Sequence, residues 1–334
     1  MNALHHGGRL YQAAAEFDIP LTQWLDLSTG IHPQGWRPAR SMPDSCWNRL
    51  PEEEDGLLSA AQHYYGTAHI LPIAGSQAAI QTVPRLCGVG KVGILTPTYA
   101  EHAHAWRQAG HQVVEVKGDQ VSALLPELNV LVVVNPNNPT GTYYSKQQLM
   151  AWLQQLSSHD GLLVVDEAFM DATPEASLLD QVGVPGLVVL RSLGKFFGLA
   201  GARVGFCMGP APWLSRMAEW LGPWTLSHPA RWVATGALKD ENWQQRTRQE
   251  LPKLSHRLMT GLTDAGLTPT GGTGLFQYVR HFQAKQIGYR LAQKGILVRG
   301  FESPSALRFG LPGEEAQWQR FQQALSAVMQ DLQR

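Results

Sequence analysis

Short apolar runs that recur between residues 92 and 209 constrain the fold of this chain more than any other feature. They are rich in Val, Ile and Leu and nearly continuous in apolar character, which is typical of strands covered on both faces. An amphipathic stretch at 145–159 begins at Ser145, a suitable N-cap, and places Leu149, Trp152, Leu153 and Leu156 on one face. This alternation predicts an α/β domain with a mostly parallel sheet flanked by helices. The apolar runs are VGILTP (92–97), HQVVEV (111–116), NVLVVVNP (129–136), GLLVVDE (161–167), GLVVLRS (186–192) and ARVGFCMG (202–209).

The pattern changes after about residue 225, where longer polar helices and short strands replace the apolar runs. We therefore expect a large α/β domain over residues 36–224 and a smaller α+β domain formed by residues 1–35 and 225–334. The elements of the smaller domain are a polar helix at 240–262, strands at 275–280 and 295–301, the segment ALRFGLP (306–312), and an amphipathic helix from Glu314.

Charge and cysteine content exclude several classes of protein. Lys and Arg number 27 and Asp and Glu number 27, so no net charge attracts nucleic acid or an anionic membrane. No apolar run reaches the ~18 residues of a membrane span, and no basic, apolar leader is visible. His102 and His104 point to different faces of a helix, so we expect no metal site. With Cys46, Cys87 and Cys207 scattered, we expect a cytoplasmic protein without disulfides.

The segment RSLGKFFGLAGARVGF (191–206) carries Lys195 and Arg203 in nearly apolar surroundings. A nucleotide-binding P-loop is excluded, because Val189 stands where its first glycine belongs and Phe196 where its Ser or Thr belongs. One interpretation is a solvated lysine and a surface arginine. The other is a buried lysine that forms an imine, beside a phosphate site that includes Arg203.

Polar residues follow the predicted strands at their carboxyl ends, where ligands bind in doubly wound sheets. Each has a structural explanation when taken alone: Asp166 could cap a helix, and NPNNPTG (135–141) is a favourable turn. The residues are Gly75, Ser76, Gln77, Tyr99, Asn138, Asp166, Ser192, Lys195 and Arg203.

NPNNPTG, DEAF (166–169) and SLGKFFGLAGARVG (192–205), in this order, resemble the pyridoxal-phosphate enzymes of the aspartate aminotransferase fold, known as fold type I. The resemblance spans nearly the whole chain. It implies that Lys195 forms an imine with pyridoxal 5'-phosphate, that Asp166 pairs with the pyridine nitrogen, and that Asn138 hydrogen-bonds the 3-oxygen of the ring. Tyr99 would stack on the ring. The cofactor phosphate would be held by Ser76, Gln77, Ser192 and Arg203.

The chemistry of these residues suits the cofactor. An anionic Asp166 favours a protonated pyridine, which is the better electron sink. The helix that opens after Gly75 presents N–H groups and a positive dipole to a phosphate. Apolar neighbours and the charge of Arg203 would lower the pKa of Lys195. The family forms dimers with the sites at the interface, so we expect a homodimer in which Tyr64 reaches the phosphate of the partner's cofactor. Many relatives have Tyr where Phe169 stands, so Phe169 is left out of the site.

The ends of the chain indicate the reaction. HHGG (5–8) and LDLSTGIHPQG (25–35) resemble the cobalamin-pathway threonine-phosphate decarboxylases, which convert O-phospho-L-threonine to aminopropanol phosphate and CO2. The resemblance implies that His6 and Gly7 contact the substrate, together with Gly30, where those enzymes usually have Asn.

Two arginines near the C-terminus extend this resemblance. Arg308 matches the arginine that binds the substrate's α-carboxylate, with Asn138 beside it, and Arg299 matches a second arginine of the decarboxylases. A substrate with both a carboxylate and a phosphate would account for both guanidinium groups. The alternative is a histidinol-phosphate or related amino acid aminotransferase, which shares the core motifs. An effector-sensing module fused to a DNA-binding domain is disfavoured, because the chain has no basic helix-turn-helix extension.

Overall fold

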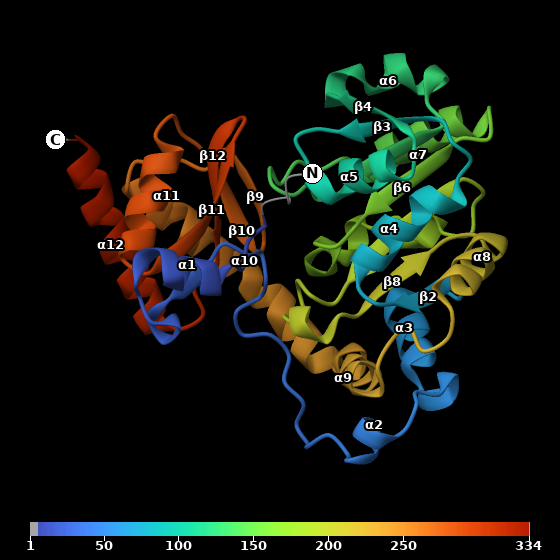
Figure 1. Cartoon of the computed structure of the whole chain (residues 1–334), viewed down its shortest axis with the longest axis horizontal. Coiled ribbons are helices and arrows are strands. Elements are labelled where there is room, and N and C mark those ends of the chain that lie inside the picture. The colour runs from blue at the N-terminus through green and yellow to red at the C-terminus, as the bar shows by residue number, and fades with distance from the viewer. Residues whose placement is uncertain (1–5, 334) are drawn as a thin grey trace. The chain divides into compact units, whose positions relative to one another are not determined.

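A computed structural model describes residues 6–333 of the chain, the last of these by its backbone only. The chain divides into two compact units (Figure 1). The large unit contains Trp36–Asn138 and Thr142–Gln245. The small unit contains the N-terminal segment up to Gly35, the triplet Pro139–Gly141 and the chain from Arg246 onward.

A seven-stranded sheet forms the centre of the large unit, in the order β2-β8-β7-β6-β5-β3-β4. Strands β3 to β7 are parallel, β8 is antiparallel to β7, and β2 is antiparallel to β8. Every residue of β5, β6 and β7 is buried, as the continuous apolar runs predicted. The strands are β2 (Ile70–Ile73), β3 (Lys91–Leu95), β4 (Gln112–Val116), β5 (Val130–Val134), β6 (Leu162–Asp166), β7 (Leu187–Ser192) and β8 (Gly205–Met208).

Helices cover both faces of this sheet, and the prediction for the helix after Ser145 is confirmed. The Ser145 Oγ accepts a hydrogen bond from the Gln148 backbone N–H at 3.2 Å, and the four predicted apolar residues are buried. The helices are α2 (Ser45–Asn48), α3 (Leu57–Tyr65), α4 (Ser76–Leu86), α5 (Ala100–Gln108), α6 (Val121–Leu124), α7 (Lys146–Ser157), α8 (Ala211–Leu221) and α9 (His228–Lys239). None of the described helices is both long and apolar enough to cross a membrane.

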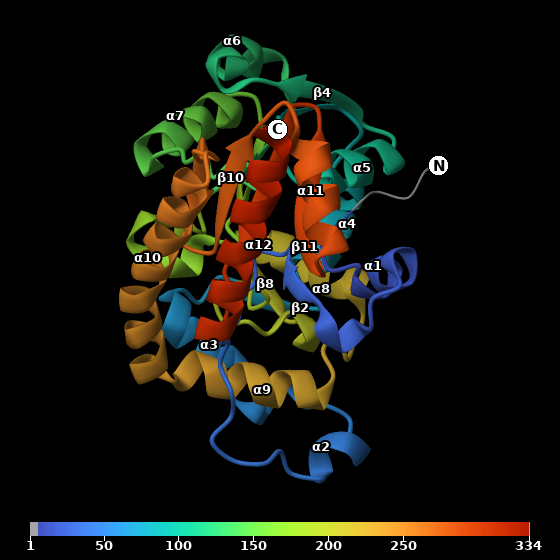
Figure 2. The ribbon, with the colours of Figure 1, turned by 90° about the vertical axis from the view of Figure 1, so that its left-hand side faces the viewer.

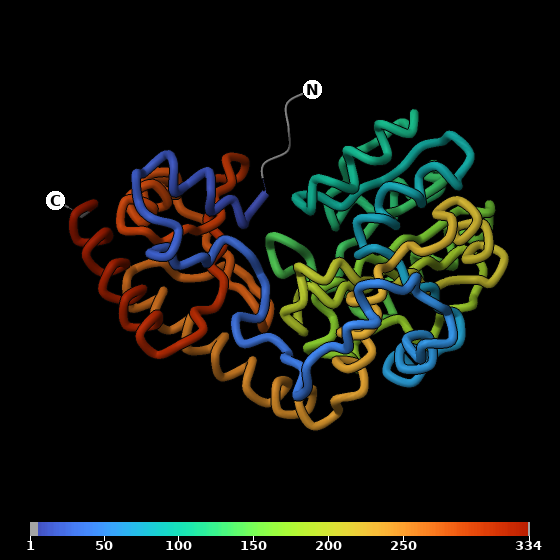
Figure 3. The backbone as a smooth tube through the Cα atoms, turned by 60° about the horizontal axis from the view of Figure 1, so that its bottom comes forward, coloured from blue at the N-terminus to red at the C-terminus, as the bar shows by residue number. Residues whose placement is uncertain are grey.

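The small unit has a five-stranded sheet in the order β1-β11-β12-β10-β9. The N-terminal strand β1 pairs in parallel with β11, so the first part of the chain completes a sheet made mostly from its last part (Figure 3). Figure 2 shows α11 and α12 lying over β10 and β11. The strands are β1 (Leu25–Leu27), β9 (Gly271–Thr273), β10 (Phe276–Arg280), β11 (Ile296–Glu302) and β12 (Ser305–Gly310). The helices are α1 (Leu10–Phe17), α11 (Ala284–Gln293), α12 (Glu315–Gln333) and α10 (Glu241–Asp264), which starts in the large unit.

The boundary expected near residue 225 lies elsewhere in the structure, which groups residues 225–245 with the large unit. Helix α9 packs on α3, and Arg231 of α9 donates two hydrogen bonds to the carboxylate of Asp55, at 2.5 and 2.8 Å. The contacts of α9, and not the change of sequence pattern near residue 225, therefore decide the unit to which this helix belongs.

The triplet Pro139–Gly141 packs against β9 although the chain on both sides belongs to the large unit. Gly141 has a φ of 72°, and a Cβ there would overlap the backbone of Gly272. A Cβ at Gly271 would in turn overlap the Thr140 carbonyl oxygen. Glycine is required at these positions because two backbones touch there.

Candidate active site

The topology of the large sheet brings the predicted cofactor residues to one edge. Strands β3, β5, β6 and β7 are parallel, so their carboxyl ends meet there. The antiparallel strand β8 begins at this edge and β2 ends at it. Polar residues at this edge therefore come from six strands: Ser76 and Gln77 after β2, Tyr99 after β3, Asn138 after β5, Asp166 on β6, Ser192 and Lys195 at the end of β7, and Arg203 before β8.

Asp166 is a buried carboxylate held by two described partners. Its Oδ1 accepts a hydrogen bond from the Ala168 backbone N–H at 3.0 Å, and its Oδ2 lies 3.0 Å from His102 Nε2. Both side chains are buried, at 4% and 1% exposure. A hydrogen bond from the imidazole N–H would fix the orientation of the carboxylate.

His102 is a site residue that the sequence analysis missed, because it was considered only as a metal ligand. It lies on α5 three residues after Tyr99, and its ring is 6.3 Å from the Tyr99 ring between centroids. Its partner Asp166 is 64 residues away in the chain. The sequence signal for His102 is its spacing of three residues from Tyr99. This spacing points to Asp166 only when β3 and β6 are known to end at the same edge of the sheet.

The guanidinium of Arg203 lies against the start of α4. Gly75, the N-cap of α4, has φ 74° and ψ 162°, and a Cβ there would lie 2.9 Å from Arg203 Nη2. A Cβ at Gly205 would lie 2.6 Å from the Ser76 backbone nitrogen. Arg203 Nη1 donates to the Ala200 carbonyl at 3.1 Å. A cation beside a helix N-terminus, with glycines that leave the backbone open, is suited to an anion.

Lys195 lies in an aromatic environment. Its Nζ is 5.4 Å from the centroid of the Phe169 ring, and the neighbouring Phe196 and Phe197 are fully buried. The Ser192 Oγ accepts a hydrogen bond from the Gly194 backbone N–H at 3.2 Å, which shapes the turn that leads to Lys195.

Tyr99 and Gln77 interact at the same edge. The Tyr99 hydroxyl lies 3.5 Å from Gln77 Oε1, and Gln77 Nε2 donates to Glu101 at 3.0 Å. Burial, with the charges of Glu101 and Asp166, raises the pKa of Tyr99 to about 12, so the phenol is neutral at physiological pH. Asn138 is half-buried.

Tyr64 faces a buried ion cluster of its own chain. Its hydroxyl donates to Asp171 at 3.2 Å, and Arg191 pairs with Asp171 at 2.9 Å and with Glu167 at 3.1 Å. Burial alone lowers the pKa of Arg191, but the charges of Asp171 and Glu167 outweigh this effect and raise it. The cluster ties the segment that follows β6 to Arg191 on β7.

The small unit brings Arg299 and Arg308 together. They are direct partners in the antiparallel pairing of β11 and β12. Arg308 is 7% exposed and donates from Nη2 to the Ser28 carbonyl at 2.7 Å. Burial, then the charge of Arg299, lowers the pKa of Arg308 to about 10, while Asp26 raises it. Arg308 is still cationic at neutral pH, and two cations placed opposite each other favour an anionic ligand.

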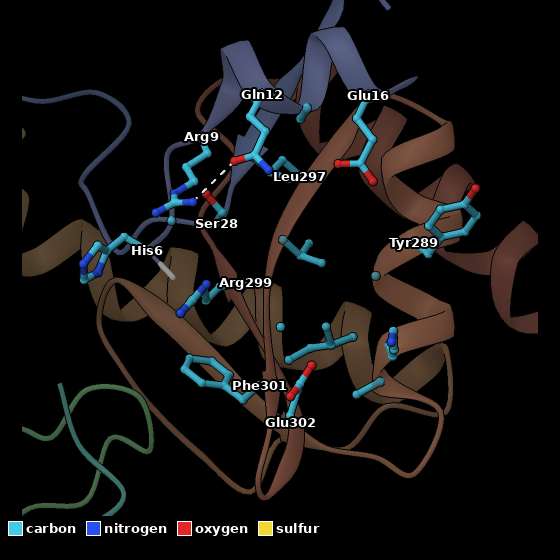
Figure 4. Close-up of a pocket in the computed structure, with 18 of the residues that line it drawn as sticks. His6, Arg9, Gln12, Glu16, Ser28, Tyr289, Leu297, Arg299, Phe301 and Glu302 are labelled. Atoms are coloured by element: carbon cyan, nitrogen blue, oxygen red, sulfur yellow. Dashed lines mark hydrogen bonds between the residues drawn. The ribbon is translucent and has the colours of Figure 1, made fainter. Parts of the chain in front are cut away.

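His6 and Gly7 lie near this pair in the same unit. They line, with Arg299, a cavity of about 610 Å³ (Figure 4). Gly7 allows a close approach to Ser28, whose carbonyl a Cβ at Gly7 would overlap, and the Gly8 N–H donates to Ser28 Oγ at 2.7 Å. Gly30 is buried just after β1. His5, the first residue of HHGG, lies outside the described residues.

Comparison with known proteins identifies the family. Residues 52–325 match the family described as aminotransferase class I and II. The chain is 53% identical to threonine-phosphate decarboxylase from Pseudomonas aeruginosa over 322 residues. The aligned region covers 96% of this chain and 97% of that protein. It is 40% identical to a threonine-phosphate decarboxylase from a Sinorhizobium species, over 97% of this chain and 98% of that one.

A solved structure supports the fold assignment. Histidinol-phosphate aminotransferase from Sinorhizobium meliloti, in complex with pyridoxal-5'-phosphate, has a TM-score of 0.83 at 20% identity and covers 99% of this chain and 100% of that chain. The predicted fold class is thus confirmed: the protein has the fold type I architecture of a large α/β unit and a smaller α+β unit. The chain belongs to the class I and II aminotransferase family, whose enzymes use pyridoxal 5'-phosphate.

Proposed function

We propose that this protein decarboxylates O-phospho-L-threonine to (R)-1-aminopropan-2-yl phosphate and CO2, as a cytoplasmic lyase of cobalamin biosynthesis. The observation that carries the proposal is the cross-strand pair Arg299–Arg308 in the small unit, beside the segment that contains His6 and Gly7. The relatives named threonine-phosphate decarboxylase, at 53% and 40% identity over nearly the full length, support it.

The described residues fit pyridoxal 5'-phosphate. The space that a Cβ at Gly75 would fill, between α4 and Arg203, suits the phosphate group. Buried Asp166 suits the pyridine nitrogen, and Lys195 the aldehyde carbon. Tyr99 would lie against the ring and Asn138 would contact its 3-oxygen. The phosphate would be held by Ser76, Gln77, Ser192 and Arg203, with Tyr64 from the other subunit of a homodimer.

Asp166 and His102 set the electrostatics at one end of the cofactor. When bound, the cofactor supplies an electron sink for the bond that breaks at the substrate Cα. An ionised Asp166 stabilises the protonated ring nitrogen on which that sink depends. Because His102 lies 3.0 Å from its Oδ2, the carboxylate has little freedom to turn away.

Arg308 and Arg299 orient the substrate. Arg308 would bind the α-carboxylate, and Arg299, His6 and Gly7 would bind the phosphate. Asn138 and Gly30 are the remaining proposed substrate contacts. Two fixed anions determine the rotation of the substrate about Cα. The rotation that these contacts set would decide between loss of CO2 and loss of the α-proton, and we propose that it favours decarboxylation. Lys195 would release the amine product.

The test of the reaction is turnover without a second substrate. We expect the purified protein to release CO2 and aminopropanol phosphate from O-phospho-L-threonine over many turnovers with no keto acid present. Histidinol phosphate with 2-oxoglutarate should give little glutamate. Glutamate in the second assay, with the first assay silent, would replace this proposal with an aminotransferase.

We expect the substitution Gly75→Ala to weaken cofactor binding. The new Cβ would push on the Arg203 guanidinium, and Gly75 has a backbone conformation that only glycine adopts readily, which costs about 1–3 kcal/mol. Cofactor affinity, measured from the visible absorbance of the titrated apoprotein, should fall at least about 10-fold, equivalent to about 1.4 kcal/mol.

Gly222→Ala is the matched control. Gly222 has φ 73° and ψ −175°, close to the conformation of Gly75, but a Cβ there would meet no atom within 4 Å. The control should lose a similar amount of stability, read from thermal unfolding, and keep its cofactor affinity. Equal affinity losses in the two variants would show that backbone strain, and not the approach to Arg203, is responsible.

A further inference from the structure

The cavity on the exposed face of β11 has one cationic end. Helices α1 and α11 form its walls, and its lining is mostly apolar (Figure 4). At one end His6, Arg9 and Arg299 face one another, while Glu16 and Tyr289 lie at the other end. Arg9, the N-cap of α1, was not among the residues that the sequence analysis selected.

The charge of Arg9 acts on Arg299. Both side chains are half-buried. Burial, then the charge of Arg9, lowers the pKa of Arg299, and Arg299 has the same effect on Arg308. The three arginines therefore form a row that runs from Arg9 through Arg299 to Arg308. The charge of Asp26 raises the pKa of Arg308, and this carboxylate already accepts two hydrogen bonds from Ser28.

The charge of this row matches the proposed substrate. A phosphate monoester carries about −1.5 to −2 at neutral pH, and an α-carboxylate adds one further negative charge. If Arg308 takes the carboxylate, Arg299 alone leaves part of the phosphate charge uncompensated. A second guanidinium at the phosphate end supplies the missing charge and further N–H donors.

We propose that Arg9 binds the substrate's phosphate together with Arg299, and that it selects a dianionic phosphate over a singly charged group of the same size. The proposal rests on the proposed function, since it assigns one more residue to the same substrate. It also explains why the HHGG segment leads directly into α1: the short connection brings His6 and Arg9 to the same end of the cavity.

The test compares Arg9→Gln with wild-type holoenzyme. Losing a hydrogen bond to a charged group corresponds to about 10- to 140-fold in affinity, so KM for O-phospho-L-threonine should rise within that range. O-sulfo-L-threonine, a monoanion of similar shape, is the second probe, measured as a competitive inhibitor. Wild type should bind the phosphate better than the sulfate, and Arg9→Gln should lose most of this preference. Arg9→Lys, which keeps the charge, should restore part of it.

Lys285→Gln is the matched control, because Lys285 lines the same cavity from α11 and its removal changes the net charge equally. It should leave both affinities within about twofold of wild type. The proposal is overturned if Arg9→Gln retains the wild-type preference for phosphate over sulfate, or if it weakens both ligands equally.

Binding of inorganic phosphate to the holoenzyme, measured by calorimetry, separates this inference from the proposed function. The cofactor's own phosphate then fills the anion site of the large unit. If O-phospho-L-threonine is not decarboxylated by wild type, the proposed function fails. Arg9 is still supported if Arg9→Gln weakens binding of inorganic phosphate and Lys285→Gln does not, and it is refuted if neither variant weakens it.

Discussion

Replacing Lys195 with alanine should abolish turnover, with a loss of about 10⁴-fold or more, because the substitution removes both the covalent attachment of the cofactor and a positioned base. Lys117 also follows a strand of the large sheet, β4, but its side chain is exposed, whereas Lys195 lies beside the buried Phe196 and Phe197. Bound cofactor should be lost on dialysis, since only non-covalent contacts to Asp166 and the phosphate site remain.

The location of the covalent bond is measured directly. Borohydride reduction of the wild-type holoenzyme should fix the cofactor on the peptide that contains Lys195. Lys146→Ala is a suitable control, because this lysine forms an exposed ion pair with Asp180 at 3.2 Å at the start of α7. The control should keep its visible absorbance and its rate. A label on any other lysine would end this assignment.

The substitution Arg308→Ala should have the second-largest effect. Removing one partner of a desolvated charge pair costs roughly 2–5 kcal/mol, or about 30- to several-thousand-fold in kcat/KM. Arg308 is 7% exposed and still cationic at neutral pH, so a substrate carboxylate bound there loses its water and gains a full charge partner. Cofactor loading should be unchanged, because Arg308 belongs to the small unit.

Two further variants separate binding from folding. Arg308→Lys keeps the charge but not the planar pair of donors, and should recover part of the activity. Arg257→Ala removes another arginine of the small unit, one that pairs on the surface with Glu315 at 2.7 Å, and should change kcat/KM less than about twofold. Near-normal kinetics in Arg308→Ala, together with lower thermal stability, would mean that the residue only supports the fold through its hydrogen bond to Ser28.

The parallel strands were predictable because burial on both faces leaves a continuous apolar run. The strand before Gly75, β2, was expected without bounds, because it has only four residues, contains Pro72, and lies at the edge of the sheet. Its direction and that of β8 depend on pairing between residues far apart in sequence, such as Ile70 and Met208. Local pattern carries no information about such pairing.

Site residues were predictable where they lie in continuous motifs. Asp166, Lys195 and Arg203 lie in or beside β6, β7 and β8, and the sheet brings their motifs to one edge. His102 and Arg9 were not selected, because only the tertiary structure brings them to Asp166 and Arg299. In the sequence, His102 is a single histidine on a helix and Arg9 is an arginine near the N-terminus. Neither pattern indicates a function by itself.

The triplet Pro139–Gly141 has a consequence for dividing the protein into fragments. The chain passes from one unit to the other at 35/36, 138/139, 141/142 and 245/246. A fragment that starts at Arg246 would lack β1, which pairs with β11, and would lack the backbone of Thr140 and Gly141 that packs on β9. The complementary fragment would expose that triplet with nothing to cover it. Proteolysis within α10 should therefore yield two pieces that remain associated, and neither piece should fold when it is expressed alone.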